Sequence, residues 1–385
     1  MTKGPFCPWC MEDLDFKHLE KIPHICPEGH VHIPKSKHKN LYCPECKKDV
    51  SLMQCPFCGT NLPPAYETFD EYRAVTLVGP KQVGKTVFLT VLTHEMTQGG
   101  IHSFVREFST SVNINTQFMN TLNKNYVNLY NDKENERKVL EYTKTGDQRP
   151  LVLELKNTAH GTSLALVIYD TPGELYGVID KNDEVNRPPI SNYLRKSDGI
   201  LFLIDPLQLP SVRDVISIPE SSLPMDNGDL IYNNMFKTIL TQISACIRVD
   251  KSNVTKDNKI NKKMAVVLMK FDVLMKAPQN NAEAAIIFGP DSIPVNVSRD
   301  PSDSPADWLS KINYISQDLE DRFINIHVSD LGYSLRAEYM DFKFFPTSAL
   351  GENPNGLKLS HVPMPFKIYD PFVWLLSATD SHVLD

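Results

Sequence analysis

One stretch, VTLVGPKQVGKTVFLT at residues 75–90, constrains the fold of this chain more than any other. Gly79 is followed by four intervening residues and then by Gly84, Lys85 and Thr86, which is the spacing of a phosphate-binding loop between a strand and a helix. In such a loop backbone N–H groups surround the phosphates, the Lys reaches the β- and γ-phosphates, and the Thr hydroxyl binds magnesium. The residues of the loop predicted to bind nucleotide are Gly79, Val83, Gly84, Lys85, Thr86 and Val87.

Apolar runs of strand length alternate with longer helical patterns through most of the chain. The runs are RAVTLVG, PLVLELK, SLALVIYD, GILFLID, MAVVLMK and FKFFPTS, and the helical patterns cover residues 85–96, 231–249 and 308–327. Buried strands separated by helices are typical of a parallel sheet with helices on both faces. The predicted fold class is therefore α/β, a P-loop domain with a mostly parallel sheet and helical insertions.

The chain has 385 residues, which is more than one such domain needs. We expect a zinc-binding module at residues 1–60, a linker at 61–72 that contains two prolines, and the nucleotide domain at 73–385. The excess length is assigned to insertions near 99–141, which reads as largely helical, 206–228 and 277–304.

The cysteines are concentrated at the N-terminus. Seven of the eight lie between Cys7 and Cys58, mostly in pairs with two residues between them, and in a reducing compartment this pattern indicates metal rather than disulfides. Thiolate and imidazole ligands in groups of four select tetrahedral zinc and leave no open position for a substrate. We therefore expect a structural module with two zinc ions. The remaining Cys246 lies in a helical pattern and is expected to be a small buried hydrophobe.

The ligands of the two zinc sites can be grouped by their order in the chain. One predicted site is a zinc ribbon made by Cys43, Cys46, Cys55 and Cys58. The other predicted site is made by Cys7, Cys10, Cys26 and His30. His30 is preferred because Gly29 lets the turn close before it, although His32, His24 and His38 remain alternatives. A cross-braced arrangement that pairs the first knuckle with the third also remains open.

Charge and hydropathy disfavour a nucleic-acid-binding protein and a membrane-spanning protein. The net charge of −7 does not favour a surface built for nucleic acid, and residues 1–60 contain eight lysines against seven acidic residues. We therefore expect the zinc module to dock on protein. The longest apolar runs, such as 200–204, are far shorter than the ~20 residues that span a bilayer, and no signal peptide precedes Cys7. A cytoplasmic protein is expected.

Three further motifs follow strands. In LALVIYDTPGE, Asp170 is placed to hold magnesium through water, and the N–H of Gly173 can approach the γ-phosphate. In MAVVLMKFDVL, Lys270 and Asp272 follow a strand, and a carboxylate there can accept the N1–H and the exocyclic amine of guanine, a donor pair that adenine lacks. In FFPTSALG, Ser348 and Ala349 offer a backbone N–H to the guanine O6.

With these motifs in this order, residues 73–375 resemble a Ras-like GTPase of the translation-factor-related class. The chain also resembles the bacterial double-GTPase proteins predicted in conflict and phage-defence systems, some of which carry N-terminal zinc ribbons. The resemblance implies GTP or GDP and Mg²⁺ as ligands, GTP hydrolysis, and a protein partner such as an effector, a second GTPase or another copy of the chain.

Two positions, Met269 and Glu174, differ from the pattern of that family, and one, Thr145, is the candidate for a further residue of the pattern. Met269 stands where the family has Asn or Thr. Thr145, preferred over Thr143, is the candidate for the threonine that senses the γ-phosphate. Glu174 occupies the place of a glutamine that orients water, so slow intrinsic hydrolysis is expected, with Lys85 essential. The leading hypothesis is a GTP-dependent switch; the alternatives are a weakly hydrolysing scaffold and a zinc-ribbon RNA or translation factor.

Overall fold

The structure is a computed structural model of the full chain. It describes residues 4–33, 42–48, 50, 52–80, 82–97, 108–111, 124–131, 133, 136–139, 150–157, 161–171, 189–213, 229–276, 282–300 and 302–377.

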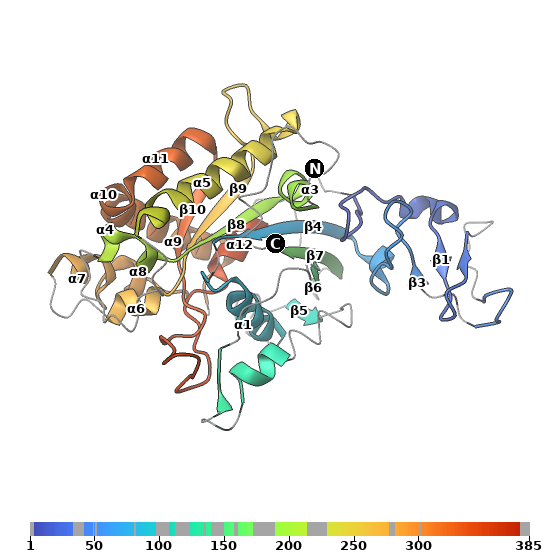
Figure 1. The fold of residues 1–385 in the computed structure, drawn as a ribbon, viewed down its shortest axis with the longest axis horizontal. Coiled ribbons are helices and arrows are strands. Elements are labelled where there is room, and N and C mark those ends of the chain that lie inside the picture. Colours follow the sequence, from blue (N-terminus) through green and yellow to red (C-terminus); the bar gives the residue numbers. More distant parts are fainter. Residues whose placement is uncertain are drawn as a thin grey trace.

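A seven-stranded sheet forms the centre of the larger part, with strand order β10-β9-β8-β4-β7-β6-β5 (Figure 1). The strands are β4 (Glu71–Val78), β5 (Phe108–Ser111), β6 (Leu151–Asn157), β7 (Thr162–Asp170), β8 (Gly199–Ile204), β9 (Lys263–Leu268) and β10 (Phe342–Pro346). The pairs from β10 to β7 are parallel, and β6 and β5 are added antiparallel at one edge. The predicted α/β fold with a mostly parallel sheet is confirmed.

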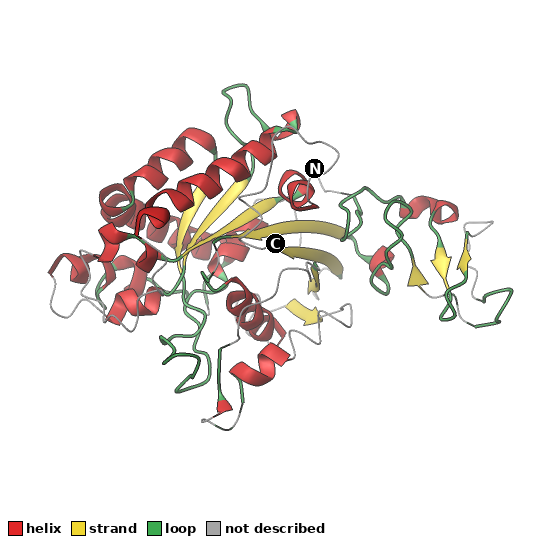
Figure 2. Cartoon of the chain, in the orientation of Figure 1, coloured by secondary structure: helices red, strands yellow, loops and turns green. Residues whose placement is uncertain are grey.

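Helices cover both faces of this sheet (Figure 2). They are α1 (Lys85–Thr97), α3 (Pro189–Lys196), α4 (Pro210–Arg213), α5 (Asp229–Arg248), α6 (Phe271–Lys276), α7 (Ala282–Phe288), α8 (Ile293–Asn296), α9 (Pro305–Leu319), α10 (Asn325–His327), α11 (Ser329–Glu338) and α12 (Asp370–Leu376). A π-helical turn, η10 (Glu320–Ile324), joins α9 to α10. Short 3₁₀ turns are η1 (Phe16–Lys21), η2 (Tyr66–Thr68), η6 (Pro206–Gln208) and η8 (Lys251–Asn253).

Alternation along each strand creates two apolar cores. In β8, for example, Leu201 and Leu203 face the core that contains α1 and α12, whereas Ile200 and Phe202 face the core that contains α5 and α11. Successive strand side chains point to opposite faces, so a strand buried on both faces has to be apolar throughout. This is why the continuous apolar runs in the sequence correctly predicted these strands.

The N-terminal module contains a small antiparallel sheet, with the order β2 (Val31–His32), β1 (His24–Ile25) and β3 (Leu52–Met53). It lies at one side of the molecule, where its inner part adjoins β4 and β7 (Figure 1). The segment 61–72, expected as a linker, is packed: Leu62, Tyr66 and Phe69 are buried in the apolar cluster that joins the module to the large sheet. The boundary between the two domains remains a prediction.

The predicted insertions are described in part. The first contributes the edge strand β5 as well as a helical segment at 124–129, so the described part is not only helical. The second begins with η6 and α4, and the third contains α7 and α8. Among the described helices, none combines the length and the apolar content that crossing a bilayer would take.

Candidate nucleotide site and zinc-binding module

The candidate nucleotide site lies at one edge of the large sheet. Strands β4, β7, β8, β9 and β10 run parallel, so their carboxyl ends meet at this edge. Ligands of open α/β sheets bind outside the carboxyl ends of the strands. Each motif predicted from the sequence directly follows one of these ends, so the sheet brings the four motifs together.

The phosphate-binding loop depends on its two glycines for different reasons. A Cβ on Gly79 would lie 2.6 Å from the carbonyl oxygen of Leu203, so the loop can pass β8 only without a side chain there. Gly84 has a φ of +97°, a backbone conformation that L-residues with side chains rarely adopt. After this residue the chain enters α1, whose first two residues are Lys85 and Thr86. N–H groups at a helix N-terminus form a ready site for phosphate.

Lys85 folds back over the loop. Its Nζ donates hydrogen bonds to the carbonyl oxygens of Gly79 at 2.7 Å and Pro80 at 2.9 Å. These contacts hold the ammonium group at the mouth of the loop, where a phosphate bound to the helix N-terminus would meet it.

Asp170 ends β7 beside the loop, paired in register with Leu77 of β4. Its Oδ1 is buried and has no hydrogen-bond partner in the described structure. Burial raises the pKa of Asp170 to about 6, although the nearby charge of Lys85 acts to lower it. A buried, unpartnered carboxylate oxygen is costly unless a cation or donor meets it. The donor set therefore fits a magnesium ion that Asp170, through water, and the Thr86 hydroxyl would hold.

Several predicted residues of this site cannot be placed. Gly173, Glu174, Thr145 and its alternative Thr143 lie outside the residues that the structure describes. The described neighbour Thr171 donates its hydroxyl and its N–H to the carbonyl oxygen of Leu77, so the chain is anchored to β4 as it leaves β7.

The predicted base-recognition pair lies at the end of β9. Asp272 is in the first turn of α6, is 5% exposed, and has a buried Oδ2 without a hydrogen-bond partner in the described structure. Lys270 has a φ of +56°, which is unfavourable for a residue with a side chain. Its Nζ lies 2.6 Å from Oδ2 of Asp205, so an ion pair holds Lys270 in this conformation.

Asp205 was not among the residues predicted from the sequence. It follows β8, is fully buried, and uses its other oxygen, Oδ1, to accept the N–H of Leu207 at the start of η6. The sequence contained a signal for Asp205, because the run GILFLID ends in an aspartate just as the run SLALVIYD does. Its ion pair with Lys270 could not be predicted, because it depends on the ends of β8 and β9 lying side by side in the fold.

The last motif contributes backbone rather than side chains. The N–H of Ser348 donates to the carbonyl oxygen of Phe366 at 3.1 Å, which leaves Ala349 as the candidate for a base oxygen. Met269 is buried, and its Cε lies 3.7 Å from where a Cβ on Gly84 would be. Met269 therefore supports the phosphate-binding loop by packing, at the position where the resembled family has a side chain that forms hydrogen bonds.

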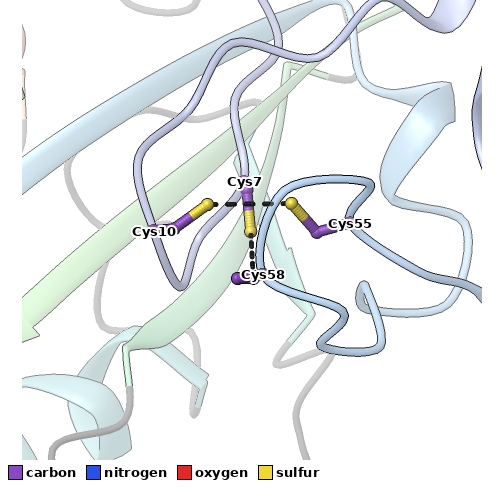
Figure 3. A group of neighbouring side chains, drawn as sticks. All are labelled: Cys7, Cys10, Cys55 and Cys58. Carbon is purple, nitrogen blue, oxygen red and sulfur yellow. Dashed lines mark hydrogen bonds between the residues drawn. The ribbon is translucent and has the colours of Figure 1, made fainter.

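The cysteines form two clusters, but their grouping differs from the prediction. The inner cluster combines the first and last knuckles, Cys7, Cys10, Cys55 and Cys58 (Figure 3). The outer cluster combines the two middle ones, Cys26, His30, Cys43 and Cys46. The predicted ribbon of four cysteines from the third and fourth knuckles was wrong, and so was the site that joined the first knuckle to Cys26. The eight predicted ligands are the same, but they are nested rather than sequential.

The small antiparallel sheet explains the nesting. Strand β1 pairs with both β2 and β3, so the chain returns beside its own beginning before the last knuckle. The knuckle at Cys55 is thereby brought against the knuckle at Cys7, and the middle knuckles are left to pair with each other. Spacing along the chain carries no information about this antiparallel return.

Both clusters have dimensions suited to zinc. Nearest sulfur atoms are 3.5–3.8 Å apart, as between Cys7 and Cys58 or Cys26 and Cys46. Tetrahedral zinc with Zn–S bonds of about 2.3 Å separates its sulfur ligands by roughly 3.8 Å, whereas a disulfide would need about 2 Å. A hydrogen bond from Cys7 lowers the pKa of the Cys10 thiol to about 5, which favours the thiolate that a metal needs. The clusters can therefore each hold one zinc ion.

The outer cluster includes the preferred histidine. His30 Nδ1 lies 3.5 Å from the sulfur of Cys26 and 3.6 Å from that of Cys43. The alternative His32 also approaches Cys43, with its Nε2 3.0 Å from the sulfur. His24 is not part of the cluster, and its Nδ1 contacts the carbonyl oxygen of Ile22. His38 lies outside the described residues.

The chain is similar to several known proteins. A family model described as Double-GTPase 2 matches residues 73–287, which is more than half of the chain. The chain is 22% identical over 346 residues to the "Putative ESX-1 scaffolding and assembly protein SaeC" of Mycolicibacterium smegmatis, covering 84% of this chain and 79% of that protein.

The chain is also similar to two solved structures that contain a bound guanine nucleotide. The Ski7 GTPase-like domain of S. cerevisiae, bound to GDP and inorganic phosphate, has 18% identity and a TM-score of 0.33, over 73% of this chain and 44% of that one. The SRb-GTP/SRX complex of the signal recognition particle receptor from Chaetomium thermophilum has 14% identity and a TM-score of 0.28, over 73% and 93%. The chain thus spans less than half the length of the Ski7 chain that it matches.

Proposed function

The chain belongs to the Double-GTPase 2 family, and from this premise we propose that it binds guanine nucleotide with magnesium and uses the bound nucleotide to control engagement of a protein partner. One observation carries the proposal. Two buried carboxylate oxygens without hydrogen-bond partners in the described structure, on Asp170 and Asp272, lie at the same sheet edge as the phosphate-binding loop. The first suits a hydrated magnesium ion, and the second suits the paired N–H donors of guanine.

Each residue of the site has a distinct role in this proposal. Lys85 contacts the β- and γ-phosphates, Thr86 and Asp170 hold magnesium, and Asp272 recognises the base while Lys270 packs beside it. Magnesium, when bound, neutralises charge that develops on the phosphates during transfer. Gly173 and Thr145 are proposed to contact the γ-phosphate, which would distinguish GTP from GDP.

We further propose that hydrolysis by the isolated chain is slow. Glu174 can accept a proton from water, but it cannot donate a hydrogen bond as a glutamine amide does, and its charge would lie near an anionic transition state. A partner or a second copy of the chain is then needed to complete the site. Single-turnover assays of the wild type, Glu174→Gln and Glu174→Ala over a range of protein concentrations test this. Fast turnover by the dilute wild-type monomer would contradict it.

A nucleotide-dependent scaffold that hydrolyses little is the second candidate. The name of the M. smegmatis relative, a putative scaffolding and assembly protein, supports this candidate. Met269 also supports it, because the resembled family has a hydrogen-bonding side chain at this position and Met269 only packs there. A role in bacterial defence rests on the resemblance alone. Affinity capture with GTP-loaded and GDP-loaded protein separates the two candidates, because a switch changes its partners with the nucleotide and a static scaffold does not.

The experiment that tests the proposal itself is nucleotide selection. Titration of the zinc-loaded protein with GDP, GTP and ATP in the presence of magnesium is expected to show guanine binding and at least about a hundredfold weaker binding of ATP, because a buried acceptor would be left unpaired. Lys85→Ala should abolish binding of every nucleotide. Equal affinity for ATP and GTP would exclude the assignment of Asp272.

A further inference from the structure

A hydrogen bond joins the inner zinc cluster to β7, the strand that carries Asp170. Tyr169, the residue before Asp170 on β7, is 2% exposed, and its hydroxyl donates to the carbonyl oxygen of Pro8 at 2.6 Å. Pro8 lies between the zinc ligands Cys7 and Cys10. Neighbouring strand residues point to opposite faces of a sheet. Tyr169 therefore reaches the zinc module on one face of β7, while the next residue, the proposed magnesium ligand Asp170, points to the other face.

Helix α3 holds the same knuckle from a second direction. The hydroxyl of Tyr193 donates to the carbonyl oxygen of Trp9 at 2.8 Å, and Nζ of Lys196 donates to the carbonyl oxygen of Met11 at 2.9 Å. Nζ of Lys196 also lies 3.1 Å from a carboxylate oxygen of Glu12. Three carbonyl groups of the knuckle are therefore held by side chains of the nucleotide domain.

The two tyrosines form a unit. The rings of Tyr169 and Tyr193 are stacked, with centroids 3.9 Å apart and an angle of 17° between planes. Burial raises the pKa of Tyr193 to about 12 and also raises the pKa of Tyr169, so both hydroxyls remain protonated donors at neutral pH. β7 and α3 are consecutive elements of the described chain, so the knuckle is held by two neighbouring elements of the nucleotide domain.

The knuckle can hold these contacts only while its turn is formed. Its turn is closed by the hydrogen bond from the N–H of Met11 to the carbonyl oxygen of Cys7, and the N–H of Trp9 points at the Cys7 sulfur at 3.4 Å. Four neighbouring thiolates repel one another without a cation, and zinc binding is coupled to folding in modules of this kind. The positions of the Pro8, Trp9 and Met11 carbonyl groups therefore depend on the metal.

We infer that Tyr169 and Tyr193 are positioning residues that couple zinc in the inner cluster to magnesium–nucleotide affinity at the P-loop. The inference rests on the proposed nucleotide site. With zinc bound, the knuckle holds the end of β7 and helix α3 in fixed positions, and Asp170 is held beside the phosphate-binding loop. Without zinc, this support is lost and magnesium is held less well. Coupling between two sites is reciprocal, so bound nucleotide must tighten zinc binding by the same factor.

The first test uses conservative variants of the full zinc-loaded chain. Tyr169→Phe and Tyr193→Phe keep the rings and remove only the hydroxyl donors. We expect each to weaken binding of a fluorescent GDP analogue about fivefold or more, the lower end of typical coupling, and to raise the magnesium concentration needed for half-maximal binding. Tyr339→Phe is the matched control, since this buried tyrosine hydroxyl contacts Ser244 in the opposite core. Lys196→Met serves as a second variant if a tyrosine variant does not fold.

The second test measures the reciprocal effect and needs no change at the tyrosines. In a chain with Cys43→Ser and Cys46→Ser only the inner cluster can hold zinc, and its zinc affinity is measured by competition with a chromophoric chelator. Saturating GTP with magnesium is expected to tighten zinc binding about fivefold or more. An unchanged zinc affinity, together with an unchanged magnesium requirement in the tyrosine variants, would overturn the inference. Failure of the intact protein to bind any guanine nucleotide would instead overturn the proposed function.

Discussion

Nζ of Lys270 lies 2.6 Å from Oδ2 of Asp205, a fully buried carboxylate at the end of the adjacent strand β8. The pair joins the proposed base-recognition motif to the strand beside it and holds Lys270 in a left-handed backbone conformation. The N–H of Met269 donates to the carbonyl oxygen of Ile204 at 2.8 Å and joins the same two strand ends a second time. The base-recognition motif is thus held by β8 at both its backbone and its lysine side chain.

Asp205→Asn is expected to weaken GDP binding about tenfold and to lower the free energy of unfolding by roughly 1.5–3 kcal/mol, the usual size for a hydrogen bond to a charged group. The asparagine can still accept the N–H of Leu207, so the change removes the ion pair while keeping the start of η6. Calorimetry and urea unfolding measure the two effects. Asp341→Asn is the control, because its ion pair with Lys263 on β9 is longer, at 3.7 Å, and partly exposed. Equal effects of the two changes would mean that Asp205 has no special role.

Asp272→Asn is expected to reduce affinity for GTP and to favour xanthosine triphosphate. The amide donates a hydrogen bond where the carboxylate could only accept one, and the xanthine base offers a carbonyl oxygen in place of the guanine amine. Competition binding with the two triphosphates checks this. The asparagine variant must keep the same thermal stability as the wild type, and a variant that still prefers GTP would place base recognition elsewhere.

The two zinc clusters are expected to differ in their effect on stability. Cys55 belongs to the apolar cluster shared with β4, β6 and β7, whereas Cys43 packs in a separate small cluster with Cys26 and Val50. Each of Cys55→Ser and Cys43→Ser should reduce the zinc content from two ions to one, as measured by metal analysis. Only Cys55→Ser should lower the main thermal transition of the nucleotide domain. A similar shift from both variants would contradict the separation of the clusters.

Asp370 is expected to make stability depend on pH between about 4 and 6. Burial raises its pKa from 3.8 to about 6, while Lys367, Arg299 and the indole N–H of Trp308 act to lower it. Because the folded carboxyl group keeps its proton when the unfolded one has lost it, the contribution of Asp370 to the free energy of unfolding falls as pH rises through this window, by roughly 3 kcal/mol, and is constant above it.

Asp370→Asn provides the measurement for this group. The amide oxygen can still accept the Trp308 Nε1–H, which Asp370 Oδ1 accepts at 3.1 Å, and it carries no charge to bury. The difference in unfolding free energy between variant and wild type should therefore grow from pH 4 to pH 6 and then level off. Both proteins contain the same zinc clusters, so the titration of the thiols cancels in the difference. A difference that does not change with pH would mean that Asp370 titrates normally.

The amino-acid sequence determined those features that depend on local pattern. Continuous apolar runs predicted the strands of the large sheet, because a strand buried on both faces needs apolar residues throughout. The phosphate-binding loop was predictable because its glycines are required by its backbone: Gly84 has a positive φ, and Gly79 passes close to Leu203. The eight residues that form the two clusters were likewise predictable, since residue types and spacing of this kind in short turns are typical of zinc ligands.

Tertiary structure decided which of these local parts meet. The antiparallel return of β1 and β3 paired the knuckle of Cys7 with that of Cys55, a contact between residues far apart in the chain that spacing cannot reveal. Side-by-side strand ends paired Asp205 with Lys270, and a shared apolar face placed Tyr169 against the zinc module. These relationships arise from packing and burial summed over many residues, so the sequence specifies them only through the complete fold.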